Sequence, residues 1–321
     1  MVPIKKDIEQ IVQGLGLLAW NFSGKTVLIS GGCGFLGRYL VTTLQALNTQ
    51  LEKPCKIVII DNYITGTPYH WADKNVVLYN TNICAPFQIK ETPDYVLHAA
   101  GIASPEYYQR FPLDTIAVAI RGTQNLLEAS KQWKVDSFLY FSSSEIYGDP
   151  DPEHIPTGED YNGNVSCVSN RAVYDESKRL GETVCMVYNQ KYGIPTKTVR
   201  PFNIYGPGLK QHDKRVTPNM VHKILSKEPI CVYGNGQQTR TFCYVTDAIE
   251  GFYRALVLGQ AGQAYNIGNP EPEISMIDLA LLLCRLAPKP VAVERHPYPK
   301  EYPSDEPKRR CPDITKAKLD I

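Results

Sequence analysis

Several features that would assign a protein to a class at once are missing from this 321-residue sequence. No apolar run approaches the ~20 residues that a membrane-spanning helix needs, which argues against a membrane protein. The 34 Lys and Arg residues nearly balance the 33 Asp and Glu residues, so no excess charge favours nucleic acid or an anionic membrane surface. Hydrophobic residues at 43% and charged residues at 21% indicate an ordinary globular protein.

Metal-ligating patterns are also missing. The nine cysteines form no CxxC pair, and neither they nor the six histidines have the spacing of zinc ligands, so we expect no metal site. An odd number of scattered cysteines is typical of a reducing compartment. The first residues include Asp7 and Glu9 and no small-residue cleavage site, unlike a secretory signal. These observations predict a soluble, cytoplasmic protein.

The first 200 residues alternate short apolar segments with helical ones. Strands that are apolar on both faces are typical of a parallel sheet covered by helices on each side, so we predict an α/β fold with a Rossmann-type doubly wound parallel sheet. The predicted strands span residues 25–30, 56–61, 75–80, 94–100, 137–143 and 194–200.

Three parts of the chain differ in their pattern of apolar, proline and glycine residues. Apolar residues at helical spacing predict an amphipathic helix over residues 7–20, weakened in its second half by Gly14 and Gly16. Beyond residue 200, prolines and glycines interrupt the alternation. We therefore predict a helical extension (1–22), a dinucleotide-binding domain (23–200) and a smaller mixed α/β substrate domain (201–321), some segments of which return to the second domain.

A glycine-rich turn, GGCGFLG (31–37), directly follows the first predicted strand. Gly31 permits the tight turn, Gly34 lets the backbone approach a pyrophosphate, and Gly37 lets the next helix lie against the strand. The N–H groups at the start of that helix then face the phosphates. Asp61 closes the second strand, where a carboxylate accepts hydrogen bonds from a ribose and repels a 2′-phosphate, so the pattern favours NAD over NADP.

Tyr174 and Lys178 lie four residues apart in a helical segment, so they share one face. A lysine ammonium close to a phenol lowers its pKa from ~10 and allows it to act as a general base. Ser143 ends the fifth strand, where sites in parallel sheets open, and Glu145 follows in the same turn. These four residues are the candidate catalytic group.

Together, GGCGFLG (31–37), SSSEIYGDP (142–150), RAVYDESKR (171–179), PFNIYGPG (201–208) and VYGNGQQTRTFCYVTD (232–247) resemble an extended short-chain dehydrogenase/reductase that acts on nucleotide sugars. Within that superfamily the sequence is most similar to the UDP-glucuronic acid decarboxylases, or UDP-xylose synthases. The resemblance covers residues 25–319.

The resemblance implies a reaction. Tyr174 would take the proton of the sugar 4-hydroxyl while NAD accepts the C4 hydride, and the 4-ketone, which is β to the C6 carboxylate, would allow CO₂ to leave. Ser143 would help Tyr174 to stabilise the oxyanion, Lys178 would lower the tyrosine pKa and hold the nicotinamide ribose, and Glu145 would act near C5. UDP-glucuronate would become UDP-xylose, with NAD regenerated in place.

The resemblance also implies binding residues and a partner. The cofactor set comprises Gly31, Gly34, Phe35, Leu36, Gly37, Asp61, Asn62, Tyr63, Thr65, Gly66, Asn82, Ile83, Ala99, Tyr174 and Lys178. The substrate set comprises Tyr108, Asn203, Arg215, Tyr233, Arg240 and Arg310. Arg310 is the candidate for the C6 carboxylate. A homodimer that pairs through the helix carrying Tyr174 is expected.

Some residues depart from the family pattern. Ser143 replaces a threonine, Glu106 replaces a proline and adds negative charge, and Asn82 replaces an aspartate opposite adenine. Family members continue past the position of Ile321 with a final helix, so their carboxy-terminal packing does not transfer to this chain. The alternatives are a nucleotide-sugar 4,6-dehydratase, a 4-epimerase, and a non-catalytic nucleotide-sugar sensor.

Overall fold

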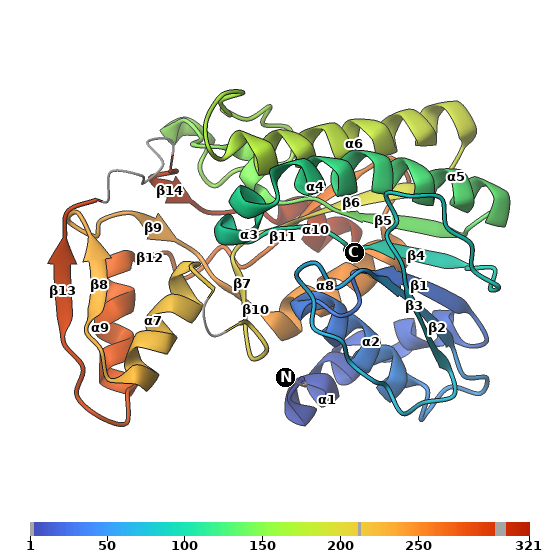
Figure 1. Cartoon of the computed structure of the whole chain (residues 1–321), viewed down its shortest axis with the longest axis horizontal. Coiled ribbons are helices and arrows are strands. Elements are labelled where there is room, and N and C mark those ends of the chain that lie inside the picture. The colour runs from blue at the N-terminus through green and yellow to red at the C-terminus, as the bar shows by residue number, and fades with distance from the viewer. Residues whose placement is uncertain (1–2, 211–212, 299–305) are drawn as a thin grey trace.

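A seven-stranded parallel sheet forms the centre of the larger lobe (Figure 1). The structure, a computed structural model, describes residues 3–210, 213–298 and 306–321. The strand order is β11-β6-β5-β4-β1-β2-β3, and every pair of neighbours is parallel. The strands are β1 (Thr26–Ser30), β2 (Lys56–Asp61), β3 (Val76–Asn80), β4 (Tyr95–His98), β5 (Ser137–Phe141), β6 (Thr196–Pro201) and β11 (Ala264–Ile267).

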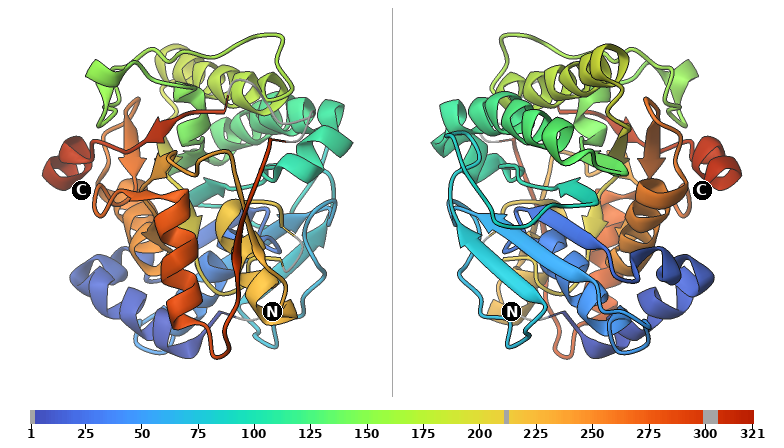
Figure 2. Two further views of the ribbon diagram at one scale, coloured as in Figure 1. Left: turned by 90° about the vertical axis from the view of Figure 1, so that its left-hand side faces the viewer. Right: turned by 90° about the vertical axis from the view of Figure 1, so that its right-hand side faces the viewer.

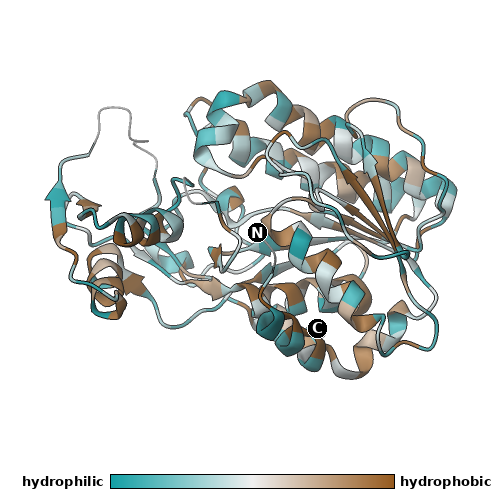
Figure 3. Ribbon diagram, turned by 60° about the horizontal axis from the view of Figure 1, so that its bottom comes forward, coloured by the Kyte–Doolittle hydropathy of each residue, from teal (hydrophilic) through white to brown (hydrophobic). Residues whose placement is uncertain are grey.

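Helices cover both faces of this sheet, as the apolar strands predict. One face carries α2 (Phe35–Leu47) and α8 (Val245–Leu258), and the other carries α5 (Thr123–Trp133) and α6 (Ala172–Tyr192) (Figure 1). The strands are the most hydrophobic part of the lobe (Figure 3), and β1 and β5 are almost entirely buried. The predicted Rossmann-type doubly wound sheet is therefore confirmed.

The smaller lobe lies beyond the carboxyl ends of these strands and has its own apolar core. Figure 2 shows its helix α9 from the outside. Its elements are β7 (Ile204–Tyr205), α7 (Val216–Ser226), β8 (Ile230–Tyr233), β9 (Thr239–Arg240), β10 (Cys243–Tyr244), β12 (Ile274–Ser275), α9 (Met276–Leu286), β13 (Val293–His296) and β14 (Arg309–Arg310). Between these elements the chain returns to the larger lobe as α8 and β11, and β11 is a seventh strand that the sequence pattern did not predict.

Two arginines lie side by side where β14 meets β9. These short strands pair in parallel, with Arg310 opposite Arg240 and Arg309 opposite Thr239. Backbone hydrogen bonds from Thr239 N to Lys308 O (3.1 Å) and from Thr241 N to Arg310 O (3.2 Å) hold this register. Arg310 is buried, whereas Arg309 lies outside and pairs with Glu273.

The amino-terminal helix is shorter than predicted. α1 spans Lys5–Leu15 and gives way to the 3₁₀ helix η1 (Gly16–Phe22), because Gly16 adopts a positive φ of 50° that ends the regular helix. α1 packs against α2 and α8. The buried Asp7 carboxylate accepts hydrogen bonds from Tyr39 Oη on α2 (2.9 Å) and Tyr244 Oη (3.2 Å).

The remaining elements are α3 (Pro105–Arg110), α4 (Pro112–Ala117), the π-helical turn η2 (Val118–Gly122), the 3₁₀ turns η3 (Ser144–Tyr147) and η4 (Pro152–His154), and α10 (Thr315–Asp320). None of the helices in the described ranges has the length and apolar character to cross a membrane.

Protein stability is expected to fall in mild acid because of His98 at the end of β4. Its ring lies between Ser30 Oγ (2.7 Å) and Thr123 Oγ1 (3.0 Å), and burial lowers the pKa of the ring to about 3. The unfolded chain, with a histidine pKa of ~6.5, takes up the proton first, so this stability is present above pH ~6.5 and is lost as the pH falls towards 3.

The matched variant is His98→Asn, which keeps a polar side chain that does not titrate. Between about pH 7 and pH 5 the parent should lose about 2 kcal/mol more of its unfolding free energy than the variant. Urea unfolding at each pH measures the difference, and parallel pH profiles would contradict the prediction.

Candidate active site

The predicted site residues follow the carboxyl ends of neighbouring strands. Gly31 follows β1, Asp61 ends β2, Ala99 follows β4, Ser143 follows β5 and Asn203 follows β6. The strand order reverses at β1, whose neighbours are β2 and β4. In doubly wound sheets ligands bind at this edge and beside this reversal.

The turn between β1 and α2 leaves room for a pyrophosphate. Gly31 has a φ of 76°, and a Cβ there would lie 2.7 Å from the Ala100 Cα. A Cβ at Gly37 would lie 2.6 Å from the Gly32 Cα. Gly34 is the N-cap of α2, Phe35 and Leu36 begin the helix, and in the part of the chain described no side chain caps it. The first-turn N–H groups can therefore face an anion, so the turn fits a dinucleotide.

Asp61 lies directly beside this turn. Its buried carboxylate accepts hydrogen bonds from the backbone N–H groups of Cys33 (2.9 Å) and Tyr63 (2.8 Å), which fix it at the end of β2. Arg38, which the sequence analysis did not single out, donates to the carbonyls of Cys33 (3.1 Å) and Thr67 (2.7 Å). Arg38 directly follows Gly37 in the first turn of α2, and this position in the sequence could have identified it as a site residue.

Other predicted cofactor residues border the same edge. Asn62, Thr65 and Gly66 lie in the loop after β2. Asn82 follows β3 and is exposed, and its Oδ1 accepts a hydrogen bond from Cys84 N (2.9 Å), whereas Ile83 is buried. An amide oxygen has a second lone pair, so Asn82 can still accept from an adenine amine.

Gly37→Ala is expected to weaken NAD binding about tenfold or more, because the new Cβ must displace the backbone of the glycine turn. Calorimetric titration of cofactor-free protein with NAD measures the affinity, and thermal unfolding shows whether the variant folds. Gly158→Ala is the control, since a Cβ there meets nothing within 4 Å. An unchanged NAD affinity in folded Gly37→Ala would contradict the expected close packing.

Tyr174 and Lys178 share one face of α6 close to Ser143. The Tyr174 ring is 6% exposed and stacks on Tyr108, with centroids 5.5 Å apart and planes inclined by 13°. Lys178 Nζ donates to the Phe141 carbonyl (2.6 Å) and lies 5.8 Å from the centre of the Tyr174 ring. The structure thus brings Tyr108, Ser143, Tyr174 and Lys178 together at the carboxyl end of β5.

Burial is the main influence on the pKa values of Tyr174 and Lys178. It raises the pKa of the Tyr174 phenol above its ordinary value, and the hydrogen bond with Ser143 acts in the opposite direction. Burial also lowers the pKa of Lys178 to about 8. The lower tyrosine pKa expected from the sequence is therefore not produced by the protein alone, because the effect of burial exceeds that of the Ser143 hydrogen bond.

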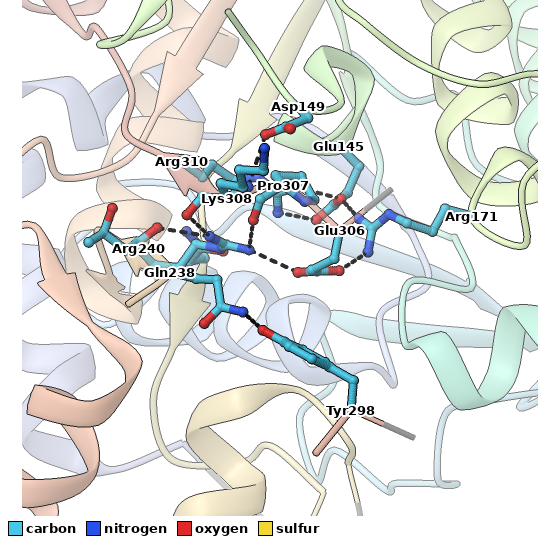
Figure 4. Close-up of polar contacts among 12 residues, drawn as sticks. Glu145, Asp149, Arg171, Gln238, Arg240, Tyr298, Glu306, Pro307, Lys308 and Arg310 are labelled. Atoms are coloured by element: carbon cyan, nitrogen blue, oxygen red, sulfur yellow. Dashed lines mark hydrogen bonds and ion pairs between the residues drawn. The ribbon is translucent and has the colours of Figure 1, made fainter. Parts of the chain in front are cut away.

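Glu145 is held between two arginines (Figure 4). Arg310 binds both carboxylate oxygens, with Nη2 2.7 Å from Oε2, and Arg171 also pairs with Oε2. Burial by itself raises the pKa of Glu145, but the two guanidinium groups outweigh it and hold that pKa at about 2. Glu145 is an anion at neutral pH.

Glu306 continues the same network. Its carboxylate bridges Arg171 on one side and Arg240 on the other, where Arg240 Nη2 lies 2.9 Å from Glu306 Oε1 (Figure 4). Sequence analysis missed Arg171 and Glu306. Arg171 lies three residues before Tyr174, and that helical spacing would have found it, whereas nothing in the local sequence marks Glu306.

The other predicted substrate residues contact partners outside this network. Asn203 has a positive φ of 44° and donates to the Thr241 carbonyl (2.8 Å). Arg215 pairs with the buried Asp213 carboxylate (2.6 Å). Tyr233 lies on β8 in the smaller lobe, with its ring 6.1 Å from that of Tyr298. The structure therefore brings Arg240 and Arg310 into one group and leaves Tyr233 outside it.

Comparisons with known proteins agree with this geometry. The profile of the NAD dependent epimerase/dehydratase family matches residues 27–268. The chain belongs to this family. The predicted membership of the extended short-chain dehydrogenase/reductases is thereby confirmed.

Two curated relatives are UDP-glucuronic acid decarboxylases. UDP-glucuronic acid decarboxylase 2 of Arabidopsis thaliana is 36% identical over 299 residues, covering 92% of this chain and 63% of that protein. UDP-glucuronic acid decarboxylase 1 of Danio rerio is 36% identical, with coverages of 92% and 68%. This chain thus spans about 63% of the length of the first of these relatives.

Solved structures of family members have the same fold. A variant of the UDP-glucuronic acid 4-epimerase of Bacillus cereus, in complex with NAD and a UDP-fluoroglucuronic acid, has a TM-score of 0.77 at 26% identity, covering 92% of each chain. The UDP-glucose 4-epimerase of Thermus thermophilus, in complex with NAD, has a TM-score of 0.76 at 25% identity, again covering 92% of each chain.

Proposed function

We propose that this protein is an NAD-dependent decarboxylase that converts UDP-glucuronate to UDP-xylose. The proposal rests on one observation: residues suited to oxidation of a sugar lie directly beside residues suited to binding a carboxylate. Tyr174 and Ser143 are suited to oxidation of a sugar hydroxyl, and directly beside them buried arginines surround Glu145. Arginine is suited to carboxylates because its planar fork forms paired hydrogen bonds. The relatives named UDP-glucuronic acid decarboxylase support the same substrate.

The Gly31–Gly37 turn would hold the pyrophosphate of NAD and Asp61 its adenosine ribose, and the bound cofactor would supply the oxidation and the later reduction at C4. Tyr174 would accept the proton of the 4-hydroxyl, and a positive charge on the nicotinamide ring would offset the burial that raises its pKa. Lys178, which donates to the Phe141 carbonyl, would hold the nicotinamide ribose.

Carbon dioxide leaves from the 4-ketone. The C5–C6 bond breaks and its electron pair moves into the ketone, so negative charge develops on the C4 oxygen. The Tyr174 hydroxyl and Ser143 donate hydrogen bonds to that oxygen. Glu145 lies in the same turn and acts near C5, where a proton must be added before C4 is reduced.

A second candidate is a UDP-glucuronate 4-epimerase, because a solved structure with that name resembles the chain at 26% identity. An epimerase performs the same oxidation but keeps the carboxylate. A 4,6-dehydratase of the dTDP-glucose type is disfavoured, since Ser144 stands where the resemblance places that enzyme's acidic residue.

The deciding experiment is incubation of the purified protein with UDP-glucuronate, followed by mass spectrometry and NMR of the products. A decarboxylase yields CO₂ and UDP-xylose without net consumption of NADH, and the purified protein carries bound NAD or NADH. UDP-galacturonate without CO₂ would establish the epimerase instead. Conversion of UDP-glucose alone would favour a 4,6-dehydratase if water is lost and a 4-epimerase if UDP-galactose forms.

We also propose a cytoplasmic homodimer. The outer faces of α4 and α6 carry exposed apolar side chains, namely Leu113 (77% exposed), Ile116, Leu180, Val187 and Tyr192. A second copy pairing through α6 would bury them. All nine cysteines are free thiols, which supports a reducing compartment. Light scattering at micromolar concentration should give twice the mass of the chain, and a monomer would contradict the dimer.

A further inference from the structure

Arg171 is a buried cation close in sequence to the predicted catalytic tyrosine, Tyr174. It is the N-cap of α6 and stands three residues before Tyr174, so both side chains come from the same turn. The residue is buried, and its backbone N–H donates to Ser169 Oγ (3.2 Å). Its charge acts on the phenol of Tyr108, whose ring stacks on Tyr174. The guanidinium therefore lies close to the stacked pair that Tyr108 forms with Tyr174.

Three carboxylates surround Arg171. Asp175 comes from its own helix, with Oδ2 3.6 Å from Nε, and Glu145 and Glu306 pair with the terminal nitrogens. Glu145 is fixed in the turn η3, where its backbone N–H donates to Ser143 Oγ (3.2 Å). Glu306 belongs to no helix or strand. Of the two carboxylates that face the site, Glu306 is therefore the one that backbone structure holds less firmly.

Arg310, to which the sequence assigns the C6 carboxylate, has both terminal nitrogens on Glu145. A substrate carboxylate at Arg310 would have to displace Glu145, which the proposed reaction needs near C5. Glu306 has no role in that reaction, yet its carboxylate bridges Arg171 and Arg240, and Arg240 belongs to the predicted substrate set. Its carboxylate stands between the two cations that an anionic substrate would require.

We propose that Arg171 binds the C6 carboxylate of the uronate, in the place that the Glu306 carboxylate takes when no substrate is bound. This inference rests on the proposed function. C4 and C6 of the sugar are both bonded to C5, so the groups that hold the 4-hydroxyl and the carboxylate must be neighbours, as Tyr174 and Arg171 are. Exchanging one carboxylate for another leaves the charge of the cluster unchanged. When the carboxylate departs as neutral CO₂, Glu306 can return to Arg171.

The test compares UDP-glucuronate with UDP-xylose, which has the same structure without the carboxylate. Binding to the NAD-loaded Tyr174→Phe protein is measured by calorimetry, so that the substrate is not consumed. Adding Arg171→Gln should weaken UDP-glucuronate binding about tenfold to a hundredfold and UDP-xylose binding less than about twofold. Arg309→Gln is the control, since Arg309 pairs with Glu273 outside the cluster and should leave both affinities unchanged.

Glu306→Gln provides a second, independent measurement. It removes the competing anion, so UDP-glucuronate should bind at least about threefold more tightly relative to UDP-xylose. Glu176→Gln, an exposed carboxylate paired with Arg179, is its control. If Arg171→Gln does not fold, as judged by circular dichroism, the Glu306→Gln result decides.

The outcomes separate this inference from the proposed function. If the parent releases CO₂ from UDP-glucuronate but the preference for the uronate survives in folded Arg171→Gln, or is unchanged in Glu306→Gln, then Arg171 has only a structural role and the inference is wrong. If the preference disappears in Arg310→Gln and persists in Arg171→Gln, the carboxylate belongs to Arg310. A parent that releases no CO₂ overturns the proposed function and this inference with it.

Discussion

Tyr174→Phe should bind its nucleotide sugar almost as well as the parent and turn it over ~10² to 10⁴ times more slowly. Phenylalanine keeps the ring that stacks on Tyr108, so the walls of the site stay in place. The phenolic oxygen, which accepts the proton and then stabilises the oxyanion, is lost. Single-turnover rates and equilibrium affinities, measured separately, distinguish lost chemistry from lost binding.

The control for this prediction is Tyr107→Phe. Tyr107 is the sequence neighbour of Tyr108, and its hydroxyl accepts a hydrogen bond from Lys210 (3.2 Å) in an exposed position. It should react at close to the parent rate. If Tyr174→Phe also kept the parent rate, another group would have to be the base.

Glu145→Gln is expected to lower the unfolding free energy by ~3–5 kcal/mol, a large effect for a single isosteric change. The half-buried carboxylate pairs with Arg171 and Arg310 together. Arg171 would keep Asp175 and Glu306, but the neutral amide would leave the buried Arg310 guanidinium without its paired carboxylate. The folded pKa of Glu145, about 2, lies below its unfolded value, so this stability is present above pH ~4.3 and is lost as the pH falls towards 2.

Urea unfolding at neutral pH measures this loss. Glu273→Gln is the matched control, because Glu273 also pairs with an arginine, Arg309, whose side chain is 45% exposed. Surface pairs of this kind contribute about 0–1 kcal/mol. Equal losses in the two variants would mean that burial of the Glu145 cluster has no energetic consequence.

Local patterns predicted most of the fold. Each of the first six strands is a short apolar run, and the glycine-rich turn marks both the end of β1 and the start of α2. β11 escaped prediction because the smaller lobe interrupts the alternation, and nothing in the four residues Ala264–Ile267 shows that they return to β6. The amphipathic pattern of residues 7–20 did not reveal that the α-helix stops at Leu15.

Part of the candidate site could be predicted from the sequence, but its network of ion pairs could not. Tyr174 and Lys178 follow from helical spacing. The pairing of Arg171 with Glu306 joins residues 135 positions apart, and that of Arg310 with Glu145 joins residues 165 positions apart. No local sequence pattern can reveal pairings between residues so far apart in the chain, because these pairings form only when the segment containing β14 lies against β9 and α6. The burial that raises the pKa of Tyr174 is likewise a property of the packed molecule.

Arg309 and Arg310 are adjacent but have opposite surroundings, exposed and buried respectively. This difference limits which mutations the protein can tolerate. Successive side chains on a strand point to opposite sides, so moving β14 by one residue along β9 would exchange them. With Arg309 moved opposite Arg240, the residue there would still be an arginine, and the composition and net charge of the chain would be unaltered. Pro307 and Cys311 would take the neighbouring inward positions, and Arg310, which holds both carboxylate oxygens of Glu145, would point outward. Insertions and deletions that shift the register of β14 against β9 should therefore be tolerated far less than substitutions at Arg309.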